Sequence, residues 1–176
     1  MQDGTLRVVP LLKEHIQLLY GWFNEPHVRL FYSLKSWTLD EVAKKFMPRI
    51  SGETSLCPFI VMCDETAIGY VQYYSLKNEN SYRSVLPPEI FDNAAGIDLF
   101  IGEADFLGKG LGSVIVRAVL EQHVWSYYQY CVVDPDQRNT ASLLMFERCG
   151  FRQHAIVSTR DDLGQVVQYV LLVKSK

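Results

Sequence analysis

The sequence predicts an α/β (α+β) fold with a mixed, mostly antiparallel central sheet flanked by helices. Segments with apolar residues at helical spacing alternate along the chain with short runs rich in β-forming residues. Two such runs flank the short turn at residues 64–66 and therefore predict a hairpin. Because helices are interleaved with strands in both orientations, we expect a mixed sheet.

The expected helices are defined by their apolar spacing and by the residues at their ends. Thr38 and Glu41 have the spacing of a capping box, which marks the start of a helix. Pro48 is expected to end that helix, and Gly150 is expected to stop the last one at its C′ position. The predicted helices cover residues 13–24, 38–47, 113–123 and 138–149.

The expected strands are short β-rich runs bounded by turn residues. The polar segment 76–93, which contains Pro87 and Pro88, is predicted to be a loop. A loop of this length in a compact domain usually binds a ligand or is mobile. The predicted strands cover residues 5–10, 57–63, 67–75, 95–101, 127–133, 151–158 and 166–173.

Length and composition predict a single domain over residues 1–176 and exclude several function classes. The net charge of −3 and the lack of a basic run argue against binding to nucleic acid or to an anionic membrane. The four cysteines form no C-x-x-C pair, so free thiols in a reducing compartment are expected. The four histidines lack ligand-like spacing, so no metal is expected. We expect a cytoplasmic protein, either a monomer or a homodimer.

A glycine-rich stretch follows the strand predicted at 95–101. Gly108, Gly110 and Gly112 leave the main chain bare, so that a ligand can touch it directly. The helix that follows would present free N–H groups and the positive end of its dipole. This combination predicts an anion site, most simply a phosphate site, although a glycine-rich turn without a ligand has a similar pattern. The spacing fits neither a P-loop nor a Rossmann fingerprint.

Asp98 lies in that same strand, between apolar neighbours. A carboxylate in an apolar strand is costly unless it is paired or functional, so Asp98 is the candidate catalytic residue, with a salt bridge at the sheet edge as the alternative. Residues 84–108 contain no Lys or Arg but five acidic residues, which favours a cationic substrate or else a solvated loop. Asp134 ends a later strand, where it either contacts an amine or caps the turn at Pro135.

Two motifs in order give the chain a resemblance to the GCN5-related N-acetyltransferases, the GNAT superfamily. One is the loop Leu107–Ser113 after a strand, and the other is Asn139 followed by Phe146–Phe151. The spacing of Gly96–Asp98 before the loop is similar to that of aminoglycoside 6′-N-acetyltransferases. Three features depart from the pattern: Leu107 replaces Arg or Gln, and Phe146 replaces the tyrosine that often acts as general acid. The acidic run that precedes Gly96 in the aminoglycoside enzymes is reduced here to Glu89 and Asp92.

The resemblance implies the GNAT fold and an acetyl-CoA-dependent N-acetyltransferase. In such enzymes the residue at Asp98 helps take the proton from the amine, either directly or by positioning the ammonium while water carries the proton. Phe31, Tyr32, Asp98 and Asp134 are the candidate substrate-binding residues. The coenzyme would be bound by Leu99, Ile101, Leu107, Gly108, Lys109, Gly110, Leu111, Gly112, Ser113, Asn139 and Phe146.

The expected reaction is acetyl transfer to a primary amine of a small cationic substrate, first an aminoglycoside 6′-amine. A hydroxylysine-type siderophore precursor or a protein amine is the second candidate. A non-catalytic acyl-CoA-binding sensor is the alternative from another class, because Phe146 has no hydroxyl.

Overall fold

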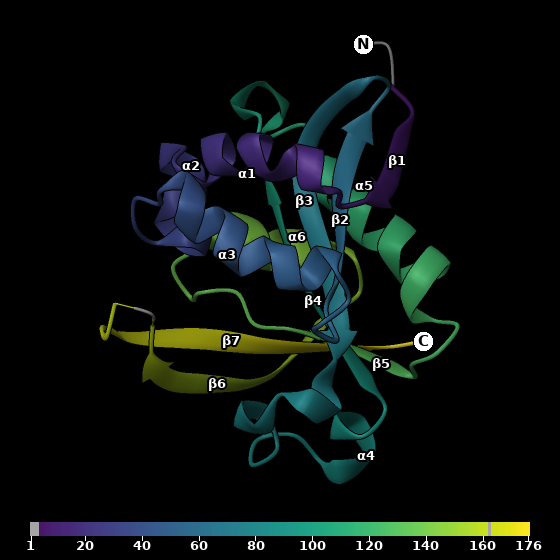
Figure 1. The fold of residues 1–176 in the computed structure, drawn as a ribbon. Coiled ribbons are helices and arrows are strands. Elements are labelled where there is room, and N and C mark those ends of the chain that lie inside the picture. The colour runs from purple at the N-terminus through teal and green to yellow at the C-terminus, as the bar shows by residue number, and fades with distance from the viewer. Residues whose placement is uncertain (1–3, 162) are drawn as a thin grey trace. The chain divides into compact units, whose positions relative to one another are not determined.

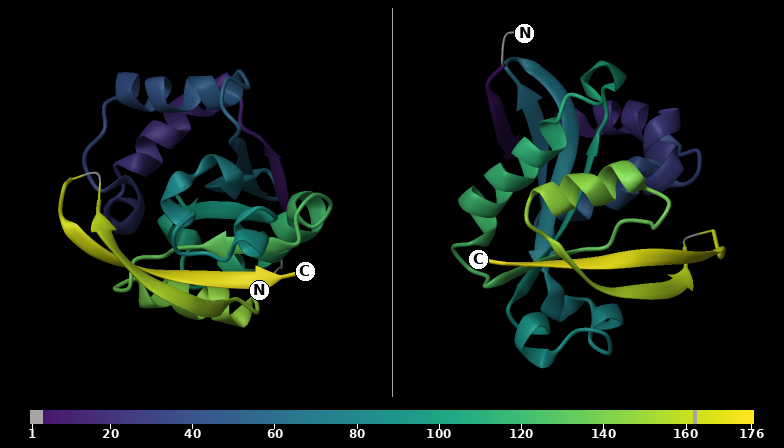
Figure 2. Two further views of the ribbon diagram at one scale, coloured as in Figure 1. Left: turned by 90° about the horizontal axis from the view of Figure 1, so that it is seen from below. Right: turned by 180° about the vertical axis from the view of Figure 1, so that it is seen from behind.

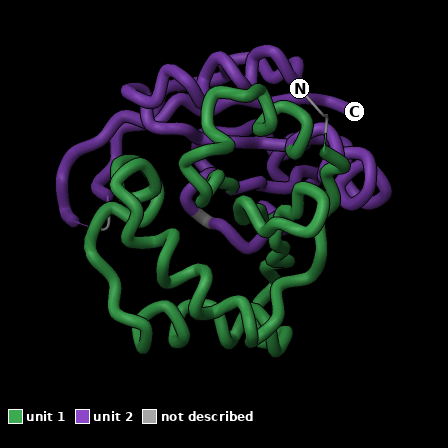
Figure 3. The backbone as a smooth tube through the Cα atoms, turned by 90° about the horizontal axis from the view of Figure 1, so that it is seen from above, with its two compact units in different colours: residues 1–72, 99–115 green, residues 73–98, 116–176 purple. Residues whose placement is uncertain are grey.

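The computed structural model describes residues 4–161 and 163–176 (Figure 1). The chain divides into two compact units (Figure 3). Unit 1 comprises Met1–Gln72 and Leu99–Ile115, and unit 2 comprises Tyr73–Asp98 and Val116–Lys176. Strands β3 (Thr66–Ser75) and β4 (Ala94–Ile101) each run from one unit into the other.

Within the described ranges, the strands form a seven-stranded sheet of order β1-β2-β3-β4-β5-β7-β6, in which β1 is Leu6–Pro10, β2 is Cys57–Cys63 and β6 is Arg152–Arg160. Strands β4 and β5 (Tyr130–Val133) pair in parallel, whereas β5 and β7 (Val166–Ser175) pair antiparallel, so the sheet is mixed. The sequence-based expectation of a mixed sheet is therefore confirmed. No helix in the described part of the chain is long and apolar enough to cross a membrane.

Unit 1 is built around an aromatic core. The ring of Phe23 lies edge-on to those of Trp37, Phe46 and Phe100, with centroids 5.3, 5.3 and 5.8 Å away. Because edge-to-face pairs are the favoured ring geometry, this cluster ties helices to the strands of the unit. Its elements are β1 (Leu6–Pro10), a 3₁₀ turn (Lys13–His15), α1 (Ile16–Phe23), α2 (Pro26–Val28), a π-helical turn (Arg29–Ser33), α3 (Leu39–Ile50), β2 (Cys57–Cys63) and a 3₁₀ turn (Ala104–Phe106).

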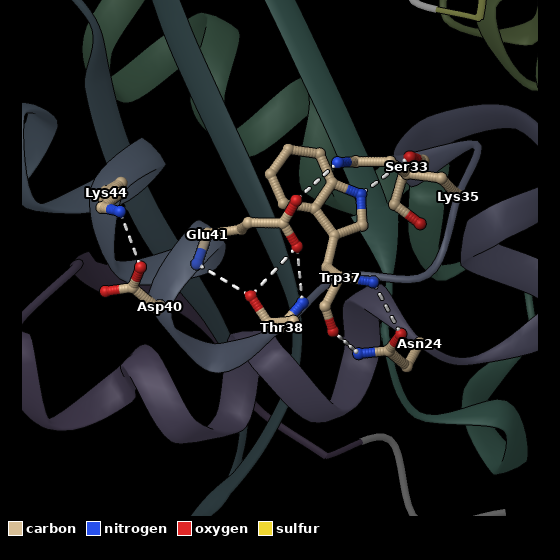
Figure 4. A network of polar contacts seen from close by, with 8 residues as sticks. All are labelled: Asn24, Ser33, Lys35, Trp37, Thr38, Asp40, Glu41 and Lys44. Carbon is tan, nitrogen blue, oxygen red and sulfur yellow. Dashed lines mark hydrogen bonds and ion pairs between the residues drawn. The ribbon is translucent and has the colours of Figure 1, made fainter.

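Helix α3 begins as predicted but ends later. The Glu41 N–H donates to the Thr38 hydroxyl at 3.3 Å, and the Thr38 N–H donates to the Glu41 carboxylate at 2.8 Å, which confirms the capping box (Figure 4). The prediction that Pro48 ends the helix was wrong. A proline removes only its own N–H, and the Pro48 carbonyl still accepts from Glu53 at 2.9 Å. The helix ends at Ile50, Ser51 is its C-cap, and Gly52, with a φ of +77°, supplies the left-handed C′ residue.

Unit 2 contains the C-terminal strands and the segment 76–93. Its further elements are 3₁₀ turns at Leu76–Asn78 and Asn80–Tyr82, α4 (Pro88–Phe91), a π-helical turn (Leu120–Val124), α6 (Thr140–Arg148) and β6 (Arg152–Arg160). Strands β6 and β7 form a long antiparallel hairpin (Figure 2). Helix α5 (Leu111–Val119) begins in unit 1 and continues into unit 2. Gly150, with φ +91°, follows α6 as predicted.

Two expectations for unit 2 need correction. The segment 76–93 is not a plain loop, because Leu76, Leu86 and Phe91 are buried in a hydrophobic cluster with Ala94, Val132 and Leu171 and support short helical turns. Strand β5 starts three residues later than predicted. The N–H groups of Tyr127 and Tyr128 both donate to the Val124 carbonyl at 3.0 Å, so these residues close the preceding helix.

Candidate active site

Strands β4 and β5 separate after a short parallel pairing in unit 2. In the described residues, their register runs from Ala94 opposite Tyr130 to Gly96 opposite Val132. Asp98 lies two residues after Gly96, and Asp134 lies two residues after Val132. Because side chains alternate along a strand, both carboxylates belong to the same face as the last pair. Two carboxylates predicted independently from the sequence are thus brought together where the strands diverge.

The two carboxylates are coupled electrostatically within unit 2. Burial, followed by the negative charge of Asp98, raises the pKa of Asp134 from 3.8 to about 7. Glu79 acts in the same sense, whereas the hydroxyl of Tyr82, which donates to Asp134 Oδ2 at 2.5 Å, opposes the rise. Like charges held close together disfavour ionisation of both groups. Asp134 is therefore a carboxyl that titrates near neutral pH.

A second tyrosine lies beside Asp98. The Tyr74 hydroxyl is 3.5 Å from Asp98 Oδ1, a long contact, and its ring occupies the space beside Gly96. A Cβ at Gly96 would lie 2.5 Å from that ring, so the glycine is required for this packing. Burial, with the Asp98 charge as a smaller cause, raises the pKa of Tyr74 well above 10.0. The hydroxyl consequently stays protonated and can only donate toward the carboxylate.

The glycine loop of unit 1 has the bare main chain that the sequence predicts. Gly108 and Gly110 have φ of +70° and +77°, and a Cβ at either position would meet no atom within 4 Å. Helix α5 starts at Leu111 directly after the loop. The Ser113 N–H donates to the Gly110 carbonyl at 3.2 Å, which closes the first turn of α5 over the loop. The start of a helix is a favourable place for an anion, so the loop and the start of α5 stay the predicted anion site. Lys109 Nζ lies 5.1 Å from the Phe106 ring centroid.

The chain matches known acetyltransferases over most of its length. Residues 12–159 match the family described as an acetyltransferase (GNAT) domain. The chain belongs to the GNAT acetyltransferases. It is 30% identical over 163 residues to the aminoglycoside N(6′)-acetyltransferase type 1 of Klebsiella pneumoniae, covering 89% of this chain and 78% of that protein. The protein of the same description from Serratia marcescens matches equally well.

Solved structures confirm the GNAT fold. The structure of AAC(6′)-Ib in complex with paromomycin and acetyl-CoA aligns with a TM-score of 0.82 at 24% identity, over 98% of this chain and 94% of that chain. The complex of AAC(6′)-Ib with coenzyme A and kanamycin aligns with a TM-score of 0.80 at 24% identity, over 98% and 95%. These structures bear out the fold expected from the sequence.

The remaining coenzyme-site candidates of this GNAT acetyltransferase have structural contacts of their own. Leu99 and Ile101 lie at the end of β4, where the Ile101 carbonyl is 3.0 Å from His27 Nε2. Asn139 caps α6 by accepting from the Ser142 N–H at 3.1 Å. Phe146 is 3% exposed and packs edge-on against Phe151. Coenzyme contacts of these residues stay a prediction.

The two aromatic residues proposed for the substrate lie in the π-helical turn of unit 1. Tyr32 packs against Phe23 and Phe100, with ring centroids 5.9 and 4.7 Å away, and is half-buried. Phe31 is half-buried as well. Trp22 is buried and donates from Nε1 to Glu103 at 2.8 Å. A substrate-binding role for Phe31 and Tyr32 stays a prediction.

The two tyrosines that contact the carboxylates, Tyr74 and Tyr82, were not predicted from the sequence. Tyr82 lies in the segment predicted to be a loop, and the available signal was that segment's unusual length. Tyr74 lies in a predicted strand, but no local pattern distinguishes it from Tyr73. The role of Tyr74 follows only from its contact with Gly96, which lies in another segment of the chain and leaves space for the Tyr74 ring.

The raised pKa of Asp134 makes stability depend on pH. Since its pKa is about 7 in the folded protein against 3.8 ordinarily, the folded state binds the proton more tightly, and the resulting stability is lost as pH rises toward 7. Asp134→Asn removes this titration. We expect the free energy of unfolding of the variant, relative to wild type, to rise by about 2 kcal/mol between about pH 5 and about pH 8. Urea unfolding at both pH values measures it.

The matched control is Asp92→Asn, which replaces an exposed carboxylate at the end of α4 in the same unit. Its stability difference from wild type should change little over that pH range. A difference for Asp134→Asn that is independent of pH would contradict the assigned electrostatics.

Proposed function

We propose that this acetyltransferase moves the acetyl group of acetyl-CoA to a primary amine of a small polycationic substrate, an aminoglycoside 6′-amine. The observation that carries the proposal is the pair of carboxylates Asp98 and Asp134, held on one face in unit 2. The curated relatives that are 30% identical are aminoglycoside N(6′)-acetyltransferases, which supports the substrate class.

The glycine loop fits the coenzyme's pyrophosphate. Positive φ at Gly108 and Gly110 leaves the main chain accessible, and the space that a side chain would fill is open. The N–H groups at the start of α5 would donate to phosphate oxygens, with the helix dipole adding favourable charge. Lys109, which is exposed, would add a positive charge. The bound coenzyme supplies an acetyl thioester with a carbonyl carbon open to attack by an amine.

The carboxylates act on the amine. A primary ammonium must lose a proton before it can attack, and Asp98 would accept that proton or hold the ammonium while water removes it. Asp134, with its pKa raised to about 7, would give its own proton up on meeting a second ammonium, because an opposite charge favours the ionised form. A substrate with several ammonium groups thereby satisfies both carboxylates.

The leaving thiolate requires little help. A thiol has an ordinary pKa of about 8.5, so its anion is a tolerable leaving group that solvent can protonate. Phe146, buried against Phe151, carries no hydroxyl that could supply a proton. An enzyme with this residue can therefore remain active without a general acid at position 146.

Release of free thiol from acetyl-CoA tests the proposal. The protein is mixed with kanamycin, hydroxylysine or a peptide with a free amino terminus, and the acetylated product is located by mass spectrometry and NMR. We expect turnover with kanamycin at the 6′-amine. Turnover with hydroxylysine alone or with the peptide alone would contradict an aminoglycoside substrate and would assign the acceptor to that other class. Tight coenzyme binding without turnover on any amine would favour a non-catalytic acyl-CoA sensor, the function suggested by Phe146.

A further inference from the structure

We propose that Tyr82 is a positioning residue for the acceptor amine, whose hydroxyl holds the Asp134 carboxylate in a fixed direction beside Asp98. The inference rests on the proposed function, since it names the residue that prepares one carboxylate for a substrate ammonium. Tyr82 itself would not touch the reacting atoms.

Apolar packing and main-chain hydrogen bonds fix the position of Tyr82. Its ring packs against the hydrophobic cluster formed by Leu76, Leu86 and Phe91 with the strands of unit 2. Its carbonyl accepts from the N–H groups of Val85 and Leu86 at 3.1 and 3.0 Å. The ring is therefore anchored by apolar packing and by main-chain bonds. Only the hydroxyl extends to the carboxylate, and its position is set by the fold of the segment 76–93.

The contact between the hydroxyl and the carboxylate is short. Tyr82 donates to Asp134 Oδ2 at 2.5 Å, in the range of charge-assisted O–H···O⁻ bonds. Burial, followed by the charge of Asp134, raises the pKa of Tyr82 far above its ordinary value. The phenol therefore remains a donor throughout the pH range in which an acetyltransferase works, and the bond fixes one of the two carboxylate oxygens.

Asp134 needs this donor because burial and the neighbouring acidic groups oppose its ionisation. The groups that act on it are Asp98 on β4, Glu79 before the Asn80–Tyr82 turn, Tyr82 and its own main-chain N–H, and its charge also acts on Tyr74 on β3. Burial and the two negative charges favour the neutral carboxyl, and the Tyr82 hydroxyl favours the carboxylate. A neutral carboxyl has no net charge to attract an ammonium. Without Tyr82, the pKa of Asp134 would lie higher, and Oδ2 would lose the donor that sets its direction.

The kinetic test is Tyr82→Phe, which removes one oxygen and retains the ring. We expect kcat/KM for kanamycin near neutral pH to fall about tenfold, mainly through KM, and the acid limb of its pH profile to move up by about one pH unit. Tyr130→Phe is the matched control. Its hydroxyl donates to Glu89 at 3.3 Å in the same unit, away from the carboxylate pair. A loss of kcat/KM with an unmoved acid limb would mean a merely structural role.

A titration that requires no activity completes the test. Protein labelled with ¹³C at the aspartate carboxyl carbons is titrated by NMR, and Asp134→Asn identifies the Asp134 signal. Tyr82→Phe should raise the midpoint of that signal by about one pH unit, because a hydrogen bond to the charged form is lost. Tyr130→Phe should leave it in place.

Site-specific 3-fluorotyrosine at position 82 retains the packing should Tyr82→Phe fail to fold. Its phenol is a stronger donor, so it should lower the Asp134 midpoint. A midpoint unchanged by either substitution overturns the role of Tyr82, whatever the activity. Absence of turnover on every aminoglycoside overturns the proposed function instead, whatever the midpoint.

Discussion

Replacing Asp98 by asparagine should lower kcat with an aminoglycoside by about 100- to 10,000-fold, the range that a positioned acid–base group contributes. Asparagine retains the size of the side chain and can still accept from Tyr74, so the fold should be preserved. Coenzyme affinity should change less than about twofold, because an amide and a carboxylate differ in charge toward the amine rather than in shape. Steady-state kinetics with kanamycin and calorimetric titration with coenzyme A measure the two quantities.

Asp92→Asn serves as the control for loss of a negative charge, since Asp92 is exposed in the same unit. It should retain wild-type kcat. The Asp98→Asn variant should also change the pKa of Asp134. The negative charge of Asp98 raises the pKa of Asp134, so its removal should let Asp134 titrate at lower pH. Equal losses of kcat and of coenzyme affinity in Asp98→Asn would instead mean that Asp98 has a structural role.

The elements of the fold were predictable wherever periodicity and end signals agree. The capping box at Thr38 and the C′ glycine at position 150 are local signals, and both are confirmed. The misplaced ends at Pro48 and Tyr127 have a common cause. The hydrogen bonds that decide them join neighbouring carbonyls to N–H groups farther along the chain, and a residue's own propensity does not reveal these bonds.

The candidate site was predictable as separate residues but not as an arrangement. Asp98 and Asp134 each stand out because each interrupts or ends an apolar strand. Their proximity depends on the parallel register of Gly96 with Val132, which is set by packing between distant segments. Tyr82 was not predictable because the residues that anchor its segment, among them Leu76 and Leu86, are scattered without a regular period.

Gly110→Val should weaken coenzyme A binding at least about tenfold, equivalent to about 1.4 kcal/mol. The φ of +77° at Gly110 lies in the left-handed region, which a β-branched side chain occupies only under strain. The added side chain would also enter space that is open in the structure, directly before the first turn of α5. Two effects are therefore combined in this variant, namely backbone strain and obstruction of the anion site.

Gly52→Val separates the two effects. Gly52 belongs to the same unit and has the same φ of +77°, and a Cβ added there would likewise meet no atom within 4 Å, but it follows α3 rather than preceding a helix. Both variants should lose about 1–3 kcal/mol of unfolding free energy from strain. Only Gly110→Val should lose coenzyme affinity in calorimetric titration. If Gly52→Val loses as much affinity, strain alone accounts for the effect, and the loop is not the site that binds the pyrophosphate.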